Sequence, residues 1–275
     1  RLKVSWQPSR MSFSVKSEKT GLEYSPSSLN GLFAPRRNLF RPRFYRMLLD
    51  IFRFKNAATA LLEGKGKDMA LGDYLRAEGY SEAFLDDFII PMGAAIWSAD
   101  PEQFWGFPAR FFVRFFDNHG FLKVMNQPQW LVIRGGSNNY VQALTRDYAD
   151  GIRVSCPVTQ VVRRADDVEI FTRDGGAERF DKVIIATHSD QALKLLAHPT
   201  EAETRILGAI PYQENMTVLH TDETVLPTHK SCWASWNYYV PAKQTGRVTV
   251  TYDMNILQTL HAPVQFCVSL NYPGT

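Results

Sequence analysis

The segment from residue 134 to residue 197 limits the fold of this chain more than any other, because helical and extended patterns follow one another there in a fixed order. Gly135-Gly136 predicts a tight turn, and apolar residues then recur at helical spacing as far as Asp150-Gly151. The segment closes with an uninterrupted apolar run at 183–186, which is typical of a strand buried on both faces of a parallel sheet. We therefore expect an α/β unit here.

A β-meander is predicted between that helix and that buried strand. Alternating patterns at 152–156, 158–162 and 168–172 each indicate an extended segment. The composition of 174–176, Asp-Gly-Gly, predicts a hairpin turn that returns the chain through Phe180.

This order of elements resembles the second half of the FAD-binding domain of flavin-containing amine oxidoreductases. The resemblance implies FAD as cofactor, with Pro157 and Val158 near its adenine end. It also implies that Ala186 and Thr187, at the end of the buried strand, lie on the cofactor side. In this family a hydride passes from a substrate carbon to the flavin, so no acid–base pair is required of the protein.

The N-terminal part of the chain extends the resemblance. MSFSV at 11–15 and GLEY at 21–24 are similar to bacterial proteins described as predicted NAD/FAD-binding proteins, which often lie beside cyclopropane-fatty-acid synthases. That context implies a lipid acyl or other apolar substrate, with an amine as the alternative, and a fatty-acid-modifying methyltransferase as partner. The family opens with a G-x-G-x-x-G unit that this sequence lacks. We therefore expect an internal fragment that binds FAD poorly or not at all.

The predicted fold is mixed α/β and α+β, divided between two domains. Residues 1–128 are expected to form the first segment of a substrate domain, with a hairpin and a helical insert. Residues 129–200 are expected to belong to the Rossmann-like FAD-binding domain. Residues 201–275 are expected to complete the substrate domain with an antiparallel sheet, because several strand patterns there are separated by turns.

The candidate site residues are mostly aromatic. PMGAAIWS at 91–98 and RFFDNHG at 114–120 match the family and imply a wall of the substrate cavity, although dense phenylalanine is also typical of plain core. His119 is a candidate proton-transfer group or simply the end of a helix. The candidates for the inner face of the sheet are Trp233, Trp236, Asn237 and Tyr238. Of all these residues, His119, Trp97 and Tyr238 are the catalytic candidates, and Trp236 joins the cofactor-binding residues.

A basic and aromatic helix is predicted over residues 42–56, opened by Pro42. Its predicted apolar stripe consists of Phe44, Leu48, Ile51 and Phe52. Such a helix either packs on its own domain or rests on anionic lipid at the inner face of a membrane.

Composition excludes several other classes of function. The net charge of +3 does not favour nucleic acid, three scattered cysteines suggest neither disulfides nor a metal site, and no apolar run is long enough to cross a membrane. These features favour a cytoplasmic enzyme. Two alternatives remain open at this point, an NAD(P)-binding oxidoreductase of similar fold and a non-catalytic lipid-binding or scaffold module.

Overall fold

The computed structural model describes residues 2–64, 68–122, 128–243 and 246–273. It has the mixed α/β architecture expected from the sequence and divides into two compact units. The first unit consists of residues 3–139 and 215–275, and the second consists of residues 140–214.

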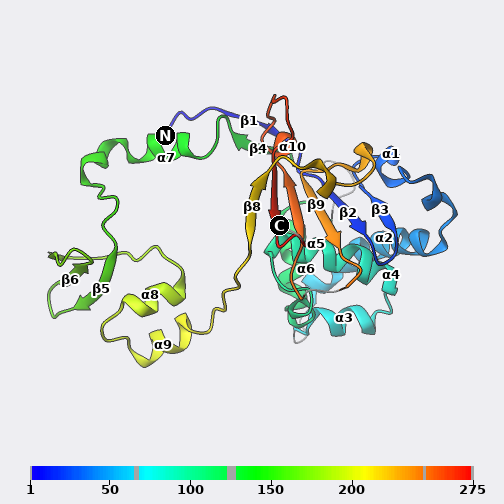
Figure 1. Cartoon of the computed structure of the whole chain (residues 1–275). Coiled ribbons are helices and arrows are strands. Elements are labelled where there is room, and N and C mark those ends of the chain that lie inside the picture. The colour runs from blue at the N-terminus through cyan, green and yellow to red at the C-terminus, as the bar shows by residue number, and fades with distance from the viewer. Residues whose placement is uncertain (1, 65–67, 123–127, 244–245, 274–275) are drawn as a thin grey trace. The chain divides into compact units, whose positions relative to one another are not determined.

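A six-stranded sheet in the order β3-β2-β9-β10-β11-β8 organises the first unit (Figure 1). Its strands are β2 Phe13–Ser17, β3 Leu22–Tyr24, β8 Thr217–His220, β9 Trp236–Val240, β10 Val250–Asp253 and β11 Cys267–Leu270. All neighbours are antiparallel except β2 and β9, which run parallel with Phe13 opposite Trp236. A separate antiparallel pair joins β1 (Trp6–Ser9) to β4 (Trp130–Ile133). The predicted antiparallel sheet and the predicted hairpin at 11–24 are thus confirmed.

The α-helices of the first unit follow local sequence signals. They are α1 Leu29–Leu32, α2 Pro42–Glu63, α3 Leu71–Ala77, α4 Glu82–Phe84, α5 Ile90–Trp97, α6 Ala109–Asn118 and α10 Met254–Leu257. Pro42 opens α2, where its missing N–H costs no intrahelical bond. Ser81 caps α4 by accepting a hydrogen bond from the N–H of Phe84. A π-helical turn at Leu85–Ile89 then joins α4 to α5 in one continuous helix.

Short 3₁₀ helices connect these elements at Arg36–Phe40, Gln103–Gly106, Glu223–Val225 and Lys230–Cys232. The last of these corrects the prediction that an extended segment begins at Ser231, since the strand itself begins at Trp236. The predicted strand at 247–251 is likewise displaced to Val250–Asp253.

The core of the first unit lies between the helices and one face of the sheet (Figure 1). Phe54, Phe84, Phe104 and Phe112 are fully buried in it. Close packing reaches its limit at Gly93 in α5, where an added Cβ would lie 2.0 Å from the ring of Phe104. The small residues of the 91–98 segment therefore accommodate neighbouring aromatic rings.

The opposite face of the sheet carries a buried row of polar side chains. Ser14, Asn237, Thr251 and Ser269 lie on four successive strands in direct register. Asn237 accepts a hydrogen bond from the Ser14 hydroxyl at 2.8 Å and donates to the Thr251 carbonyl at 3.1 Å. The Thr251 and Ser269 hydroxyls lie 2.7 Å apart. Because each buried group has a partner, this row fixes the strand register without leaving an unpaired polar atom.

The second unit holds a three-stranded meander and two helices. Its elements are a 3₁₀ helix Arg146–Gly151, β5 Val158–Arg163, β6 Val168–Thr172, β7 Ala177–Phe180, α8 Ser189–Leu195 and α9 Glu201–Leu207, and the helix α7 Asn138–Thr145 leads into it. The predicted helix after the GG turn and the predicted meander are confirmed, and Gly175 at φ +86° supplies the turn between β6 and β7.

Two predicted strands of this unit were wrong. Residues 152–156 form no strand, because the 3₁₀ helix runs to Gly151 and a bend with Ser155 at φ +57° follows. The apolar run at 183–186 also forms no strand, and the side chain of Ile184 is 93% exposed. An apolar run becomes a buried strand only when neighbouring strands take up its backbone groups, and none of the described strands pairs with this one.

Candidate functional site

The wall predicted from residues 91–120 is a continuous cluster of aromatic rings. Trp97, at the end of α5, lies at its centre and is half-buried. Its ring centroid is 4.5 Å from that of Phe115, 5.1 Å from that of Phe107 and 5.8 Å from that of Phe112. Ser98 follows in the left-handed conformation at φ +48°, which ends the helix and turns the chain away. The structure thus brings the two predicted wall segments together.

His119 ends α6, as the sequence predicted for a residue before Gly120. Its Nδ1 lies 2.8 Å from the carbonyl oxygen of Phe115, and its ring stacks on the Phe115 ring with centroids 3.9 Å apart. The carbonyl can only accept, so Nδ1 carries the proton and Nε2 is left as the ring's acceptor. Trp130 stacks beyond it at 5.9 Å. The arrangement fixes the tautomer and orientation of the ring, and its proton-transfer role stays a prediction.

The four residues predicted for one inner face of the sheet lie on different faces. Trp236 and Tyr238 pack toward the helical core, whereas Asn237 points to the polar row because side chains alternate along a strand. Trp233 precedes the strand, packs against Val225 and Leu226, and donates its indole N–H to a backbone carbonyl. Of these four, only Trp236 and Tyr238 therefore lie on the same face of the sheet and could contact the same ligand.

Trp236 has a buried indole N–H with no hydrogen-bond partner among the described residues. Its ring meets that of Tyr252 edge to face at 5.7 Å, which fixes the direction of the N–H. A buried unpaired donor costs stability unless a ligand or water accepts from it. The role of Trp236 as a cofactor-binding residue stays a prediction.

A cleft of about 120 Å³ opens beside Tyr238 in the first unit. Its apolar lining comes from the start of α5, the end of β9 and the ring of Trp105, and its polar lining contains four carboxylates. The residues of the lining with charged or aromatic side chains are Lys19, Asp86, Asp87, Asp100, Glu102, Trp105, Tyr238 and Arg247. Burial, with Asp100 nearby, raises the pKa of Tyr238, so its phenol stays protonated at neutral pH.

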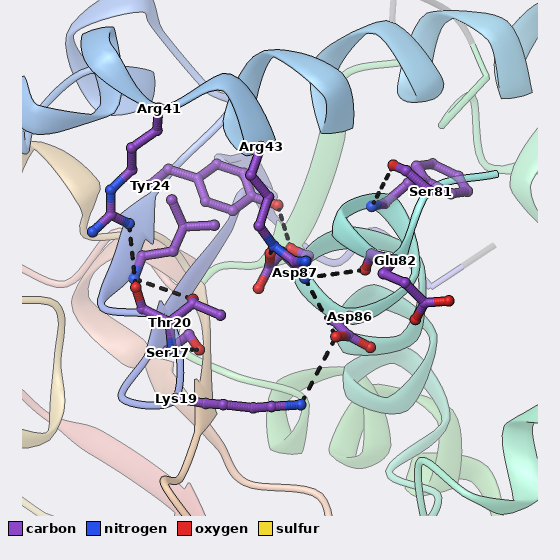
Figure 2. Close-up of polar contacts among 12 residues, drawn as sticks. Ser17, Lys19, Thr20, Tyr24, Arg41, Arg43, Ser81, Glu82, Asp86 and Asp87 are labelled. Carbon is purple, nitrogen blue, oxygen red and sulfur yellow. Dashed lines mark hydrogen bonds and ion pairs between the residues drawn. The ribbon is translucent and has the colours of Figure 1, made fainter.

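The acidic side of this cleft is held by α2 and by the β2–β3 turn (Figure 2). Arg43 Nε lies 3.2 Å from Asp87, and a terminal nitrogen of the same guanidinium lies 3.3 Å from Asp86. Lys19 reaches Asp86 from the turn at 3.9 Å, and the hydroxyl of Tyr24 donates to the backbone carbonyl of Asp87. Burial raises the pKa of Asp87, and the neighbouring Arg43 opposes that shift.

Sequence reasoning did not find this cleft. Its walls come from segments far apart in the chain, with Lys19, Asp86, Asp100 and Tyr238 on four different elements. The one local signal was the adjacent pair of carboxylates, Asp86 and Asp87, within an otherwise apolar helix. Of the two, Asp87 is buried whereas Asp86 is partly exposed, and a buried carboxylate is unusual and needs a cationic partner.

The predicted cofactor residues of the second unit differ in their surroundings. Val158 lines a hollow of about 190 Å³ together with Cys156 and Phe180, beside the start of the meander. The carbonyl of Pro157 is engaged, since it accepts from the N–H of Arg173 at 3.0 Å.

Ala186 and Thr187 lie outside any strand, with Thr187 at a bend, and the Thr187 hydroxyl donates to the carbonyl of His188. The roles of Pro157, Val158, Ala186, Thr187 and Trp236 in binding FAD stay predictions. The pyrophosphate-binding G-x-G-x-x-G turn is not in the sequence.

Solved structures of two oxidases and a fatty acid isomerase have a fold similar to that of this chain. Cyclohexylamine oxidase from Brevibacterium oxydans IH-35A matches with a TM-score of 0.60 at 13% identity, over 98% of this chain and 59% of that one. A CLA-producing fatty acid isomerase from P. acnes matches with a TM-score of 0.61 at 15% identity, over 98% of this chain and 60% of that one. A mutant of putrescine oxidase matches with a TM-score of 0.60 at 10% identity, over 98% of this chain and 59% of that one. The chain therefore spans about three fifths of the length of these structures.

The sequence comparisons identify the family directly. No curated protein sequence matches the chain significantly. The family model of flavin-containing amine oxidoreductases, in contrast, matches residues 50–253, which include both the aromatic wall and the meander. FAD is the cofactor that this match and the shared fold support. On this evidence, and as the resemblance implied, the chain belongs to the flavin-containing amine oxidoreductase family.

Proposed function

We propose that this chain is part of an FAD-dependent oxidoreductase that removes a hydride from an apolar substrate. The observation that carries the proposal is the family match at 50–253, which spans the candidate wall and the candidate cofactor residues together. When bound, the flavin supplies the hydride acceptor. The residues of this chain contribute binding, orientation and exclusion of water.

A lipid acyl chain or another apolar molecule is the substrate class that we favour. The support is the aromatic cluster around Trp97, whose surface offers dispersion contacts and few polar groups. In this proposal Trp97 and Tyr238 position the substrate, and the Nε2 of His119 accepts a proton where the reaction releases one. The cyclopropane-fatty-acid context implies the same substrate class and a fatty-acid-modifying methyltransferase as partner.

An amine is the second candidate, and the cleft beside Tyr238 favours it. Four carboxylates and two aromatic rings line that cleft, which suits a cation with an apolar body. Lys19 and Arg43 already neutralise part of the acidic charge at Asp86 and Asp87. Asp100 and Glu102 would then be the groups that attract the ligand's ammonium.

We also place the protein in the cytoplasm, in peripheral contact with the inner face of the membrane through the helix at 42–56. This placement rests on the basic and aromatic composition of that helix and on the proposed lipid substrate.

The absorbance spectrum of the full-length protein tests the proposed function. We expect flavin bands in the visible blue, and anaerobic bleaching of these bands by either a fatty acyl substrate or an amine would choose between the two substrate classes. Trp97→Leu should slow bleaching, whereas Tyr140→Leu, an exposed aromatic of the second unit, serves as the control. A colourless protein that takes up no added FAD would refute the proposal and favour a lipid-binding module.

A further inference from the structure

Helix α2 has two apolar faces, and only one of them is buried. Phe44 of the predicted stripe is buried in the core, and Leu48 and Ile51 pack partly buried against it. Met47 and Phe54, which were not in the predicted stripe, are buried there as well. Phe52, predicted to lie on that same stripe, is 54% exposed and points to the opposite side. The prediction erred because helical spacing alone cannot tell which of two apolar stripes faces the core.

The outer stripe continues into the 3₁₀ turn that precedes the helix. Leu49 is 65% exposed and Phe40 is 84% exposed, while Leu39 and Tyr45 are each exposed by about two fifths. Tyr45, Leu49 and Phe52 are spaced four and three residues apart, so they share one face. The Tyr45 hydroxyl donates to the Leu39 carbonyl at 3.1 Å and ties the turn to the helix. We call these five residues the outer α2 surface.

Three arginines adjoin the outer α2 surface along the chain and have no carboxylate partner among the described residues. Arg37 donates to the carbonyl of Gly21, Arg41 donates to the carbonyl of Thr20, and Arg36 donates to another carbonyl and to an asparagine side chain. These bonds hold the guanidinium groups in place without neutralising them. Fixed cationic groups therefore lie next to the apolar residues, two of them at the β2–β3 turn.

Two further arginines, Arg46 and Arg53, flank the helix beside the stripe. They share the single buried carboxylate of Asp50, at 3.4 Å and 3.0 Å. Basic side chains thus continue along α2, and two of them share the carboxylate of Asp50.

We infer that the outer α2 surface docks on an anionic lipid bilayer, with Phe40, Leu49 and Phe52 inserted among the headgroups and the arginines in contact with lipid phosphate. Exposed apolar and aromatic side chains next to arginines are the features that hold a helix in the plane of a membrane–water interface. A second copy of this chain would be a poor occupant, because a symmetric contact would place the same arginines against one another.

This inference rests on the proposed function and deepens the membrane contact proposed there for the helix at 42–56, and a lipid substrate gives such docking a use. Among the residues that the structure describes, no helix is long and apolar enough to cross a bilayer.

Vesicle co-sedimentation of the full-length protein tests the inference. The probes are vesicles of phosphatidylcholine alone and of phosphatidylcholine mixed with phosphatidylglycerol. We expect binding to the anionic vesicles that weakens with added salt, and little binding to the neutral ones.

Two variants separate the apolar and the basic contributions. Arg36→Gln/Arg37→Gln/Arg41→Gln should weaken binding to the anionic vesicles by about a hundredfold, and Phe40→Ser/Leu49→Ser/Phe52→Ser by about tenfold or more. The controls change the same number of exposed residues elsewhere, in the variants Arg146→Gln/Arg173→Gln/Arg205→Gln and Met69→Ser/Val154→Ser/Leu219→Ser. These should bind like the wild type.

The inference is overturned if the wild type ignores anionic vesicles, or if the surface variants and the controls bind equally. It is also overturned if light scattering shows a dimer that the Phe40 variant converts to a monomer while vesicle binding is absent. Phe40→Ser alone guards against misfolding, because that side chain is almost wholly exposed. Flavin absorbance and bleaching by dissolved substrate are measured on the same samples, so loss of docking is distinguished from failure of the proposed function.

Discussion

Gly93→Ala should destabilise the first unit strongly, although alanine is ordinarily the better helix former. The new Cβ would lie 2.0 Å and 2.2 Å from two carbons of the Phe104 ring. Ordinary carbon contacts need about 3.5 Å, so the ring or the helix would have to move by about 1.5 Å. Phe104 is fully buried and cannot yield easily, because the rings of Trp97, Phe107 and Phe112 lie 5.6, 5.1 and 5.4 Å away.

The expected magnitude follows from two opposing effects. Overpacking of this severity costs about 3 kcal/mol, at the upper end of the usual range, and the helix propensity of alanine returns about 1 kcal/mol. The net loss of about 2 kcal/mol should lower the Tm of the unit by about 4–8 °C. Thermal unfolding followed by circular dichroism measures it.

Two comparisons make the test specific to this contact. Gly106→Ala places its Cβ in open space, so its stability should change by less than about 0.5 kcal/mol. Combining Gly93→Ala with Phe104→Leu should relieve the clash, giving a favourable coupling of about 1 kcal/mol or more in a double-mutant cycle. Additive effects, or a Gly93→Ala protein as stable as the wild type, would refute the packing argument.

Three further predictions concern polar groups. Asn237→Ala should cost about 2–4 kcal/mol in denaturant unfolding, because several buried partners of its amide lose their hydrogen bonds; a loss below about 1 kcal/mol would contradict this. Burial raises the folded pKa of Asp87 above its unfolded value, so the wild type should gain stability relative to Asp87→Asn as pH falls through that raised pKa. A wild type that loses stability relative to Asp87→Asn on acidification would contradict this. Thr200→Ala should cost about 1 kcal/mol by removing the capping box of α9. The hydrogen bond from Arg163, with further bonds from Thr200, lowers the pKa of Glu203 to about 2, so Glu203 is ionised at neutral pH. Its contribution to the cap should be lost as pH falls from its unfolded pKa through about 2, which amide exchange at α9 can follow.

Sequence patterns predicted those parts of the fold that depend on a few adjacent residues. Two helix starts were predicted correctly from Pro42 and Ser81, and the hairpin of the meander was predicted correctly from the Asp-Gly-Gly turn at 174–176. These signals work because a cap or a turn is decided by the backbone within about four residues.

Other features could not be predicted because they depend on distant partners. The apolar composition of 183–186 indicated burial, but a strand also requires neighbouring strands. The sequence pattern around Phe52 is the same whether its side chain faces the core or, as in the structure, the solvent. The cleft beside Tyr238 arises only when the turn carrying Lys19, the helix carrying Asp86 and the strand β9 come together in space.

The π-helical turn at Leu85–Ile89 sets the rotational phase between α4 and α5. Such a turn accommodates one residue more than an α-helical turn, and each residue of an α-helix rotates the next by about 100°. Deleting one residue there would convert the turn into an ordinary α-helical turn and keep the rotational phase of α5. Gly93 would then stay against the Phe104 ring. Inserting one residue between the turn and Gly93 would instead rotate Gly93 by about 100° and bring a residue with a side chain against that ring. We therefore expect the deletion to preserve soluble expression and the insertion to abolish it.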